Sequence, residues 1–261
     1  YNDDRIGRGL DRLYRSDRTA ITTEIVLRAI KNFGLKINRI HNDSTSITLH
    51  GNYDDYDDCG AALPKHGHNK DFRPDLKQLV FSLSITSDFS VPLLFKVFDG
   101  NRTDDTTHIE NWKQLRDLIG RSDFIYIADS KLCVRDTLQF IVTEGGIFIT
   151  ILPETRKEIS LFYEWMQTNN PEWVIAIDEQ NPRKKDGIRR TYWTFDSPLL
   201  TSEGYRVVWV KSLQKQNDDG LRRLRRIEYT ENGFAALKKK KFLSEEKLQS
   251  EITTILNTNK S

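Results

Sequence analysis

The amino-acid sequence predicts a mixed α/β fold, followed by a β-rich segment and a basic helical end. Between residues 37 and 152, apolar positions alternate between strand-like and helix-like spacing, in the order strand, strand, strand, helix, strand, helix, strand. After Pro171 the apolar segments are short, aromatic and β-branched, with Pro, Gly and Asp between them. From Leu221 onward, basic residues accompany helical spacing.

The first predicted element is a helical segment from Arg5 to Phe33. Ile6, Leu10 and Leu13 recur at helical spacing, and Gly34 is typical of a helix end. The period then changes to two. Along Ile37–Leu49 every second residue lies on one strand face.

The rest of the sheet follows from the same patterns. Ser87-Asp88 is predicted to be a hairpin turn, and Asp104/Asp105 are candidate caps for a helix that ends at Ile119. A second helix passes through Leu138 and Ile141. The predicted strands are Leu79–Thr86, Val91–Phe98, Phe124–Asp129 and Ile147–Leu152.

Shorter strands are predicted over Trp173–Ile177, Thr191–Phe195 and Tyr205–Lys211, and a last helix runs from Ser244 to Leu256. We therefore expect four parts. They are a helical segment over 1–36, an α/β core over 37–170, a β-rich insertion over 171–219, and a basic helical segment over 220–261.

Composition excludes several classes of protein. The 261 residues can bury a sizeable core, and 13 Phe, 9 Tyr and 5 Trp argue against wholesale disorder. No apolar run approaches the roughly 20 residues of a membrane span. Two Cys cannot form a disulfide-dense secreted scaffold, which favours a reducing compartment. The chain begins at Tyr1 rather than Met, and we expect it to be a fragment or a processed chain.

The net charge of +2 hides an asymmetry along the chain. Residues 1–150 carry a net charge of −2 and residues 151–261 a net charge of +4. Within 183–241 there are 16 basic and 7 acidic side chains, mostly in clusters. Each cluster alone could be a solvated helix face, but four clusters close together favour a polyanionic partner.

Asp43 and Asp129 are the best candidates for a chemical site. Asp43 lies inside a predicted strand, and Asp129 closes an apolar one. A carboxylate there is costly to bury unless it is paired or binds a metal. Two carboxylates on adjacent strands can hold hard cations for phosphoryl transfer. The alternative is that either residue caps a strand end or forms a turn.

Several short stretches carry a family resemblance through their order and spacing across residues 2–152. They are Asn2-Asp3-Asp4-Arg5-Ile6-Gly7-Arg8, His41-Asn42-Asp43-Ser44-Thr45, the run from Gly67 to Gln78, Asp99-Gly100-Asn101-Arg102-Thr103-Asp104, and Ala128-Asp129-Ser130. With these stretches, the sequence resembles the DDE transposases of bacterial insertion sequences.

The resemblance implies a ribonuclease-H-like core interrupted by a β-strand insertion. It implies that Asp43 and Asp129 are the first two catalytic carboxylates and bind two Mg²⁺ ions, with Mn²⁺ as a substitute. The reaction would be hydrolysis and strand transfer at transposon ends. The implied partners are DNA and a second copy in a homodimeric synaptic assembly, in the bacterial cytoplasm and not at a membrane.

The third acid of this family is a Glu in the pattern Tyr, two residues, Arg, three residues, Glu, six residues, Lys. Glu228, Glu231 and Glu245 do not fit that pattern, so the position of the third acid is unknown. We expect that Glu to lie beyond Ser261.

DNA contacts are predicted in two places. The matched stretch from Gly67 to Gln78 contains three basic side chains that could reach phosphate, although a plain loop surface is an equal alternative. The basic clusters within 183–241 supply the other predicted contacts. The predicted contact residues are Lys70, Arg73, Lys77, Arg189, Arg190, Arg222 and Arg225. Two other functions remain open at this point: an inactive DNA-binding remnant, and a host nuclease of the same fold.

Overall fold

A computed structural model describes residues 2–53, 61–68, 71–103, 106–180, 189–242 and 244–258. The chain divides into two compact units, Tyr1–Arg156 and Lys157–Ser261. Each unit has its own sheet, so each is described by itself.

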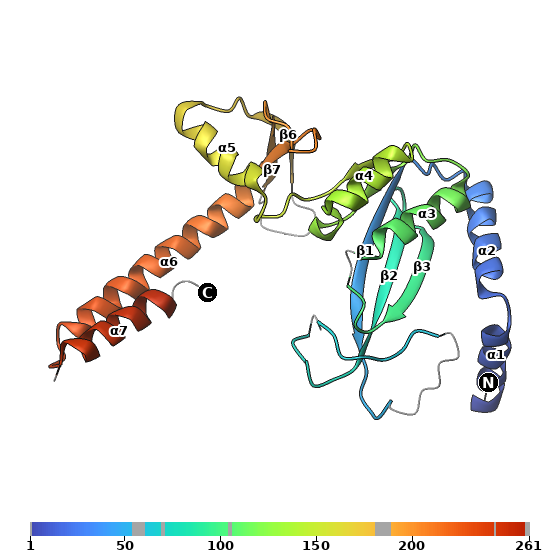
Figure 1. The fold of residues 1–261 in the computed structure, drawn as a ribbon, viewed down its shortest axis with the longest axis horizontal. Coiled ribbons are helices and arrows are strands. Elements are labelled where there is room, and N and C mark those ends of the chain that lie inside the picture. The colour runs from blue at the N-terminus through green and yellow to red at the C-terminus, as the bar shows by residue number, and fades with distance from the viewer. Residues whose placement is uncertain are drawn as a thin grey trace. The chain divides into compact units, whose positions relative to one another are not determined.

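The first unit is built on a five-stranded sheet in the order β3-β2-β1-β4-β5 (Figure 1). β1 (Arg39–Thr48), β2 (Gln78–Thr86) and β3 (Pro92–Asp99) form an antiparallel meander. β4 (Ile125–Ile127) pairs parallel to β1, and β5 (Ile147–Ile149) pairs parallel to β4. Three antiparallel strands followed by two parallel ones, with helices between the later strands, constitute a ribonuclease-H-like fold. The predicted fold class is confirmed.

The N-terminal helical segment is two helices, not one. α1 (Asp3–Arg15) ends at Ser16, and α2 (Arg18–Phe33) begins where the Asp17 carboxylate accepts a hydrogen bond from the backbone N–H of Ala20 at 2.9 Å. The apolar spacing of Ile6, Leu10 and Leu13 belongs to α1. Gly34 ends α2 as predicted, with φ of 58° in the left-handed region that favours glycine.

Two differences appear in the turns of the first unit. The hairpin between β2 and β3 is longer than Ser87-Asp88, because Phe89 and Ser90 also adopt positive φ and the Thr86 N–H donates to the Val91 carbonyl at 2.9 Å. α3 (His108–Ile119) begins after Thr107, and the predicted caps at 104–105 lie outside the described residues.

Helices α3 and α4 (Arg135–Thr143) supply the apolar core of the first unit. Trp112 of α3 is fully buried and its ring packs against those of Phe124 and Phe140 at centroid distances of 5.9 Å. Leu115, Tyr126 and Ile141 are also buried.

The face of the sheet near α3 is unusually polar. The Asn42 amide donates to the hydroxyls of Ser82 (3.1 Å) and Ser84 (2.9 Å), and Asn111 of α3 donates to Ser82 at 3.1 Å. All four side chains are at most 5% exposed. Small side chains in the strands let α3 lie close to the backbone, and the hydrogen bonds offset part of the cost of burying polar groups. The amide oxygens of Asn42 and Asn111 are buried and have no hydrogen-bond partner among the described residues.

The opposite face of the sheet carries larger apolar side chains. Register places Leu83 beside Asp43 on one side and Phe95 on the other. Phe95 stacks on Phe81 at a centroid distance of 6.2 Å, yet it is 48% exposed. Val97 and Ile149 on this face are also exposed. The sheet therefore leaves its more apolar face uncovered among the described residues.

The second unit contains a helix that the sequence patterns did not predict. α5 (Lys157–Thr168) precedes an antiparallel meander of β6 (Val174–Gln180), β7 (Arg189–Asp196) and β8 (Val208–Ser212). Its Phe162 stacks on Trp209 with centroids 3.9 Å apart, and on Trp165 at 6.1 Å. This aromatic cluster is the small core of the unit.

The unit ends in a helical hairpin. α6 (Leu213–Leu237) begins eight residues earlier than the basic helix that the sequence predicts, because the Ser212 hydroxyl caps it at the Lys215 N–H. α7 (Glu245–Thr258) runs back beside α6 (Figure 1), where Ile255 lies against Gly233. None of the described helices combines the length and the apolar character that a membrane span requires.

Candidate active site

Asp43 lies in the middle of β1, on the exposed face of the sheet. The strand alternates, so that Ile40, Asn42 and Ser44 are buried while His41 and Asp43 are exposed. The cost of burying a carboxylate, which the sequence argument considered, therefore does not arise for Asp43. One Asp43 oxygen accepts a hydrogen bond from the Ser44 N–H at 2.8 Å.

Asp129 lies just beyond the carboxyl end of β4. The strand geometry continues through Ala128, whose N–H donates to the Ile149 carbonyl at 3.2 Å. Asp129 then caps a short 3₁₀ turn, η2 (Ser130–Leu132), and accepts a hydrogen bond from the Lys131 N–H at 2.9 Å. Its carboxylate is exposed and therefore free of the cost of burial.

Strand register relates the two aspartates. β1 and β4 are parallel, with Ile40 opposite Tyr126 and His41 opposite Ile127. The ladder ends at that pair, and Asp43 and Asp129 are each two residues further along the chain. The burial pattern agrees, because Ile40 and Tyr126 both point to the buried face. Neighbouring parallel strands lie about 4.8 Å apart, so the backbones that carry the two carboxylates are adjacent if the register continues.

Neither carboxylate has a cationic partner among the residues that the structure describes. Each uses one oxygen for a local backbone N–H, and the other oxygen accepts no hydrogen bond within the described residues. Exposed carboxylate oxygens are the donors that Mg²⁺ and Mn²⁺ prefer. In the described ranges no group of three or more His, Cys, Asp or Glu side chains is arranged to hold a metal, and the third acid stays unplaced.

His41 is a neighbour that the sequence argument did not single out. It lies two residues before Asp43 on the same face, and its Nε2 is 2.9 Å from the Ser87 hydroxyl. The period-two alternation of β1 was the signal that could have identified it.

Two of the matched sequence stretches meet at one end of the sheet. Gly67 and Gly100 touch so closely that a Cβ on Gly67 would lie 2.1 Å from the Gly100 carbonyl oxygen. Asp99 accepts hydrogen bonds from the Leu63 N–H (2.9 Å) and the Lys65 ammonium (2.6 Å), which together lower the pKa of its carboxyl. These contacts fix the start of the loop that leads to Arg73 and Lys77.

The predicted DNA contacts of the first unit have different surroundings. Arg73 forms a two-point ion pair with Asp75 (2.9 and 2.7 Å), and its guanidinium lowers the pKa of Asp75 to about 2. Lys77 is half-buried at the start of β2. Lys70 lies outside the described residues.

The predicted contacts in the second unit fall into two groups. In the sheet, Arg189 pairs with Asp178 at 2.9 Å and Arg190 pairs with Glu179. On α6, Arg222 approaches Asp219 only to 3.9 Å, and Arg225 has no ion pair within the described residues. The two arginines of the sheet are therefore paired with carboxylates, whereas Arg222 and Arg225 of α6 are largely available to a ligand.

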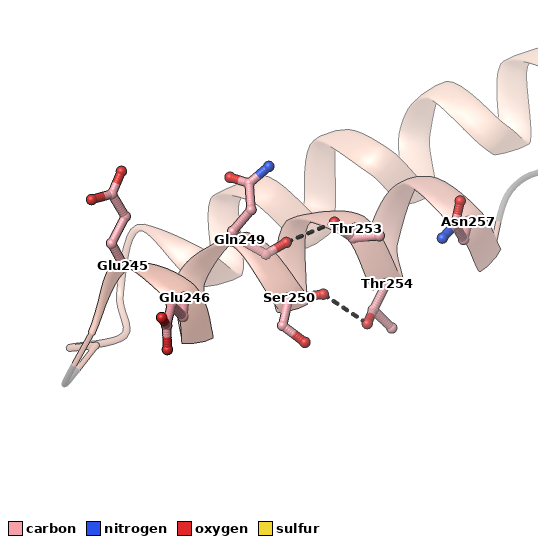
Figure 2. A pocket seen from close by; sticks show the side chains of 7 residues that line it. All are labelled: Glu245, Glu246, Gln249, Ser250, Thr253, Thr254 and Asn257. Atoms are coloured by element: carbon pink, nitrogen blue, oxygen red, sulfur yellow. Dashed lines mark hydrogen bonds between the residues drawn. The ribbon is translucent and has the colours of Figure 1, made fainter.

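A shallow hollow on α7 is not part of the aspartate site. It is lined by seven side chains of that one helix, including Glu245 and Glu246, and belongs to the second unit (Figure 2). Thr253 and Thr254 donate their hydroxyl protons to the carbonyls of Gln249 and Ser250, at 2.8 and 2.9 Å. Its lining is acidic, so it suits neither phosphate nor DNA.

Comparison with known proteins gives only distant likenesses. No protein-family model matches the chain, and no curated protein matches it. Among solved structures, a Mos1 transposase paired-end complex with the left transposon end matches with 12% identity and a TM-score of 0.30, over 57% of this chain and 53% of that one. A Mos1 mariner paired-end complex with Mn matches with 14% identity and a TM-score of 0.31, over 56% and 46%.

A piggyBac transposase synaptic complex with hairpin DNA matches with 9% identity and a TM-score of 0.39, over 76% of this chain and 40% of that one. The chain thus spans about half or less of the length of these structures. The strand order described above, and not these scores, is the basis of the fold assignment.

Proposed function

We propose that this chain carries part of the catalytic core of a DDE-type transposase. It would act on DNA by metal-dependent phosphodiester hydrolysis and strand transfer. The observation that carries the proposal is the parallel pairing of β1 with β4, which makes the strand that carries Asp43 a neighbour of the strand that leads into Asp129, with both carboxylates exposed. The order of the matched sequence stretches, as in bacterial insertion-sequence transposases, supports it.

In this proposal Asp43 and Asp129 supply carboxylate oxygens to a pair of Mg²⁺ or Mn²⁺ ions. The donor set fits, because both side chains are exposed and neither is neutralised by a cation within the described residues. A bound metal pair would activate an attacking oxygen and stabilise a leaving one. The backbone N–H groups of Ser44 and Lys131 orient the two carboxylates.

DNA is the proposed substrate and partner, and a second copy of the protein is the proposed partner in a synaptic assembly. Lys70, Arg73 and Lys77 remain proposed phosphate contacts of the first unit, and Arg189, Arg190 and Arg222 those of the second. Phosphate contacts would position the DNA without reading its sequence.

Metal binding tests the site directly. We expect Asp43→Asn and Asp129→Asn each to weaken Mn²⁺ binding by at least about tenfold, because each removes a charged ligand. The measurement is titration followed by electron paramagnetic resonance. Asp178→Asn is the matched control, since Asp178 is already paired with Arg189. If all three variants bind Mn²⁺ like the unchanged chain, the site assignment is wrong.

Activity separates the proposal from its two alternatives. In the complete protein, either Asp43→Ala or Asp129→Ala should abolish strand transfer of a transposon-end DNA and leave DNA binding unchanged. An inactive DNA-binding remnant would bind but never cut, whatever the metal. A host nuclease of the same fold would cut DNA without preferring transposon ends.

A further inference from the structure

The hairpin of α6 and α7 encloses a groove of about 1030 Å³. One wall is α6, which contributes Arg222, Arg223 and Arg226. The other wall is α7, which contributes Thr253 and Asn257. A smaller hollow of about 400 Å³ continues it along α6, and the two share Asp219 and Arg222.

Helix geometry explains why these three arginines converge. At 100° per residue, Arg222, Arg223 and Arg226 lie within an arc of about 100° on α6. Arg225 falls outside that arc and does not line the groove. Four arginines that look equivalent in the sequence are therefore divided by the helix into three that face the groove and one that does not.

Two of the guanidinium groups in the groove, those of Arg222 and Arg223, are incompletely neutralised by the described residues. All three side chains are exposed. Arg222 is 3.9 Å from Asp219, which is at the limit of an ion pair, and Arg223 has no ion pair within the described residues. Asp219 and Glu231 also line the groove, so its charge is positive but modest. This modest net positive charge can attract an anion while adding little repulsion between the side chains that line the groove.

In the β-sheet part of the same unit, by contrast, two arginines are paired with carboxylates. Arg206 is held by both oxygens of Asp196, at 2.6 to 3.1 Å, and lowers the pKa of that carboxyl. Arg189 lowers the pKa of Asp178 in the same way. Both guanidinium groups are already engaged by a carboxylate, in contrast to those of Arg222 and Arg223 on α6.

The α7 wall adds polar groups rather than charges. Asn257 points away from the α7 backbone in Figure 2 and has no hydrogen bond within the described residues. An amide can donate to a phosphate oxygen as readily as to a carbonyl. Ile227 and Leu256 give the groove an apolar contribution that a sugar can contact.

We propose that this groove binds the phosphodiester backbone of DNA, with Arg222, Arg223 and Arg226 as the contacts and Asn257 opposite them. Arginine forks match phosphate oxygens in pairs, and such contacts act on any base sequence. The inference deepens the proposed function, which supplies DNA as the partner. It replaces Arg225 of the sequence-based prediction by Arg223 and Arg226.

The test is the salt dependence of DNA binding, measured by fluorescence anisotropy with a labelled duplex in EDTA. Each phosphate contact contributes about 0.9 to the slope of log affinity against log salt. We expect Arg223→Gln or Arg226→Gln to lower that slope by about 1, and the triple Gln variant of Arg222, Arg223 and Arg226 to lower it by about 2 to 3. Gln keeps high helix propensity, and circular dichroism verifies that α6 persists.

Arg225→Gln is the matched control, with the same charge change on the same helix. It should leave the slope unchanged. An equal loss for Arg225→Gln and Arg223→Gln would mean that only overall charge matters, and would overturn the groove. Poly-glutamate that binds as tightly as DNA, with the same loss in the triple variant, would instead indicate an acidic peptide ligand and overturn the DNA assignment.

The result is independent of the aspartate site, because binding is measured without metal. Asp43→Asn should bind DNA like the unchanged chain. If the groove variants lose affinity for DNA while Asp43→Asn still binds metal, the groove assignment is supported and the metal-site assignment is rejected. If the groove variants bind DNA normally while Asp43→Asn loses metal binding, the metal site is supported and the groove is rejected. A chain that binds no DNA at all overturns the groove.

Discussion

The two faces of the five-stranded sheet are built in opposite ways. The face near α3 is buried but carries Asn42, Ser82 and Ser84, joined by hydrogen bonds of 2.9 and 3.1 Å. The face with Asp43 is exposed but carries large apolar side chains such as Phe95, which is 48% exposed. Soluble antiparallel sheets commonly do the reverse, with apolar residues inside and polar residues outside.

The difference shows that strand alternation alone does not tell which face is inward. Small polar side chains on β1 and β2 suit a helix that lies close to the strands, and their hydrogen bonds hold the strand that carries Asp43. An apolar exposed face of this size marks a surface for a covering element or partner. Asp43 therefore lies on the face that still has contacts to make.

The largest expected effect comes from the buried side of the comparison. Trp112→Ala should lower the free energy of unfolding of the first unit by about 3–5 kcal/mol, because a fully buried ring against Phe124 and Phe140 is lost. Urea denaturation measures the loss, and hydrogen exchange locates it. Val210→Ala in the second unit, at a side chain that is 61% exposed, should change stability by no more than about 0.5 kcal/mol. Similar losses for both would contradict the burial described.

A smaller effect is expected from the polar network on the same face. Asn42→Ala removes the amide that donates to the buried hydroxyls of Ser82 and Ser84. This change should lower the free energy of unfolding by about 1–3 kcal/mol. Chemical denaturation gives the value. Thr45→Ala on the exposed face of the same strand is the control and should be nearly neutral. If Asn42→Ala leaves the free energy of unfolding unchanged, the network does not stabilise β1.

Much of the fold could be predicted from the sequence, since strand and helix periods are local. The β1 alternation placed Asp43 correctly on the face opposite Ile40 and Asn42. The break between α1 and α2 was missed, because it depends on the Asp17 cap and not on the apolar period. α5 was missed because its buried positions are few, chiefly Phe162 and Glu158.

The candidate sites show the same limit. Asp43 and Asp129 were found as two separate strand residues. That their strands are neighbours follows from the parallel pairing of β1 with β4, which no local pattern contains. The number of basic side chains in each cluster can be counted from the sequence. Which arginines are compensated depends on partners eleven residues away across a strand pair, as for Arg189 and Asp178, and only the structure shows these.

The smallest expected effect tests whether the exposed apolar face is uncovered in solution. Phe95→Ser replaces a half-exposed ring and should change the free energy of unfolding much less than Trp112→Ala, by about 1 kcal/mol or less, because little burial is lost. The same change should reduce binding of a hydrophobic dye and self-association seen by analytical ultracentrifugation, since an apolar patch is interrupted. A cost comparable to that of Trp112→Ala would show that the face is covered after all. In that case Asp43 and Asp129 would lie beneath another element, and their access to metal and DNA would depend on its movement.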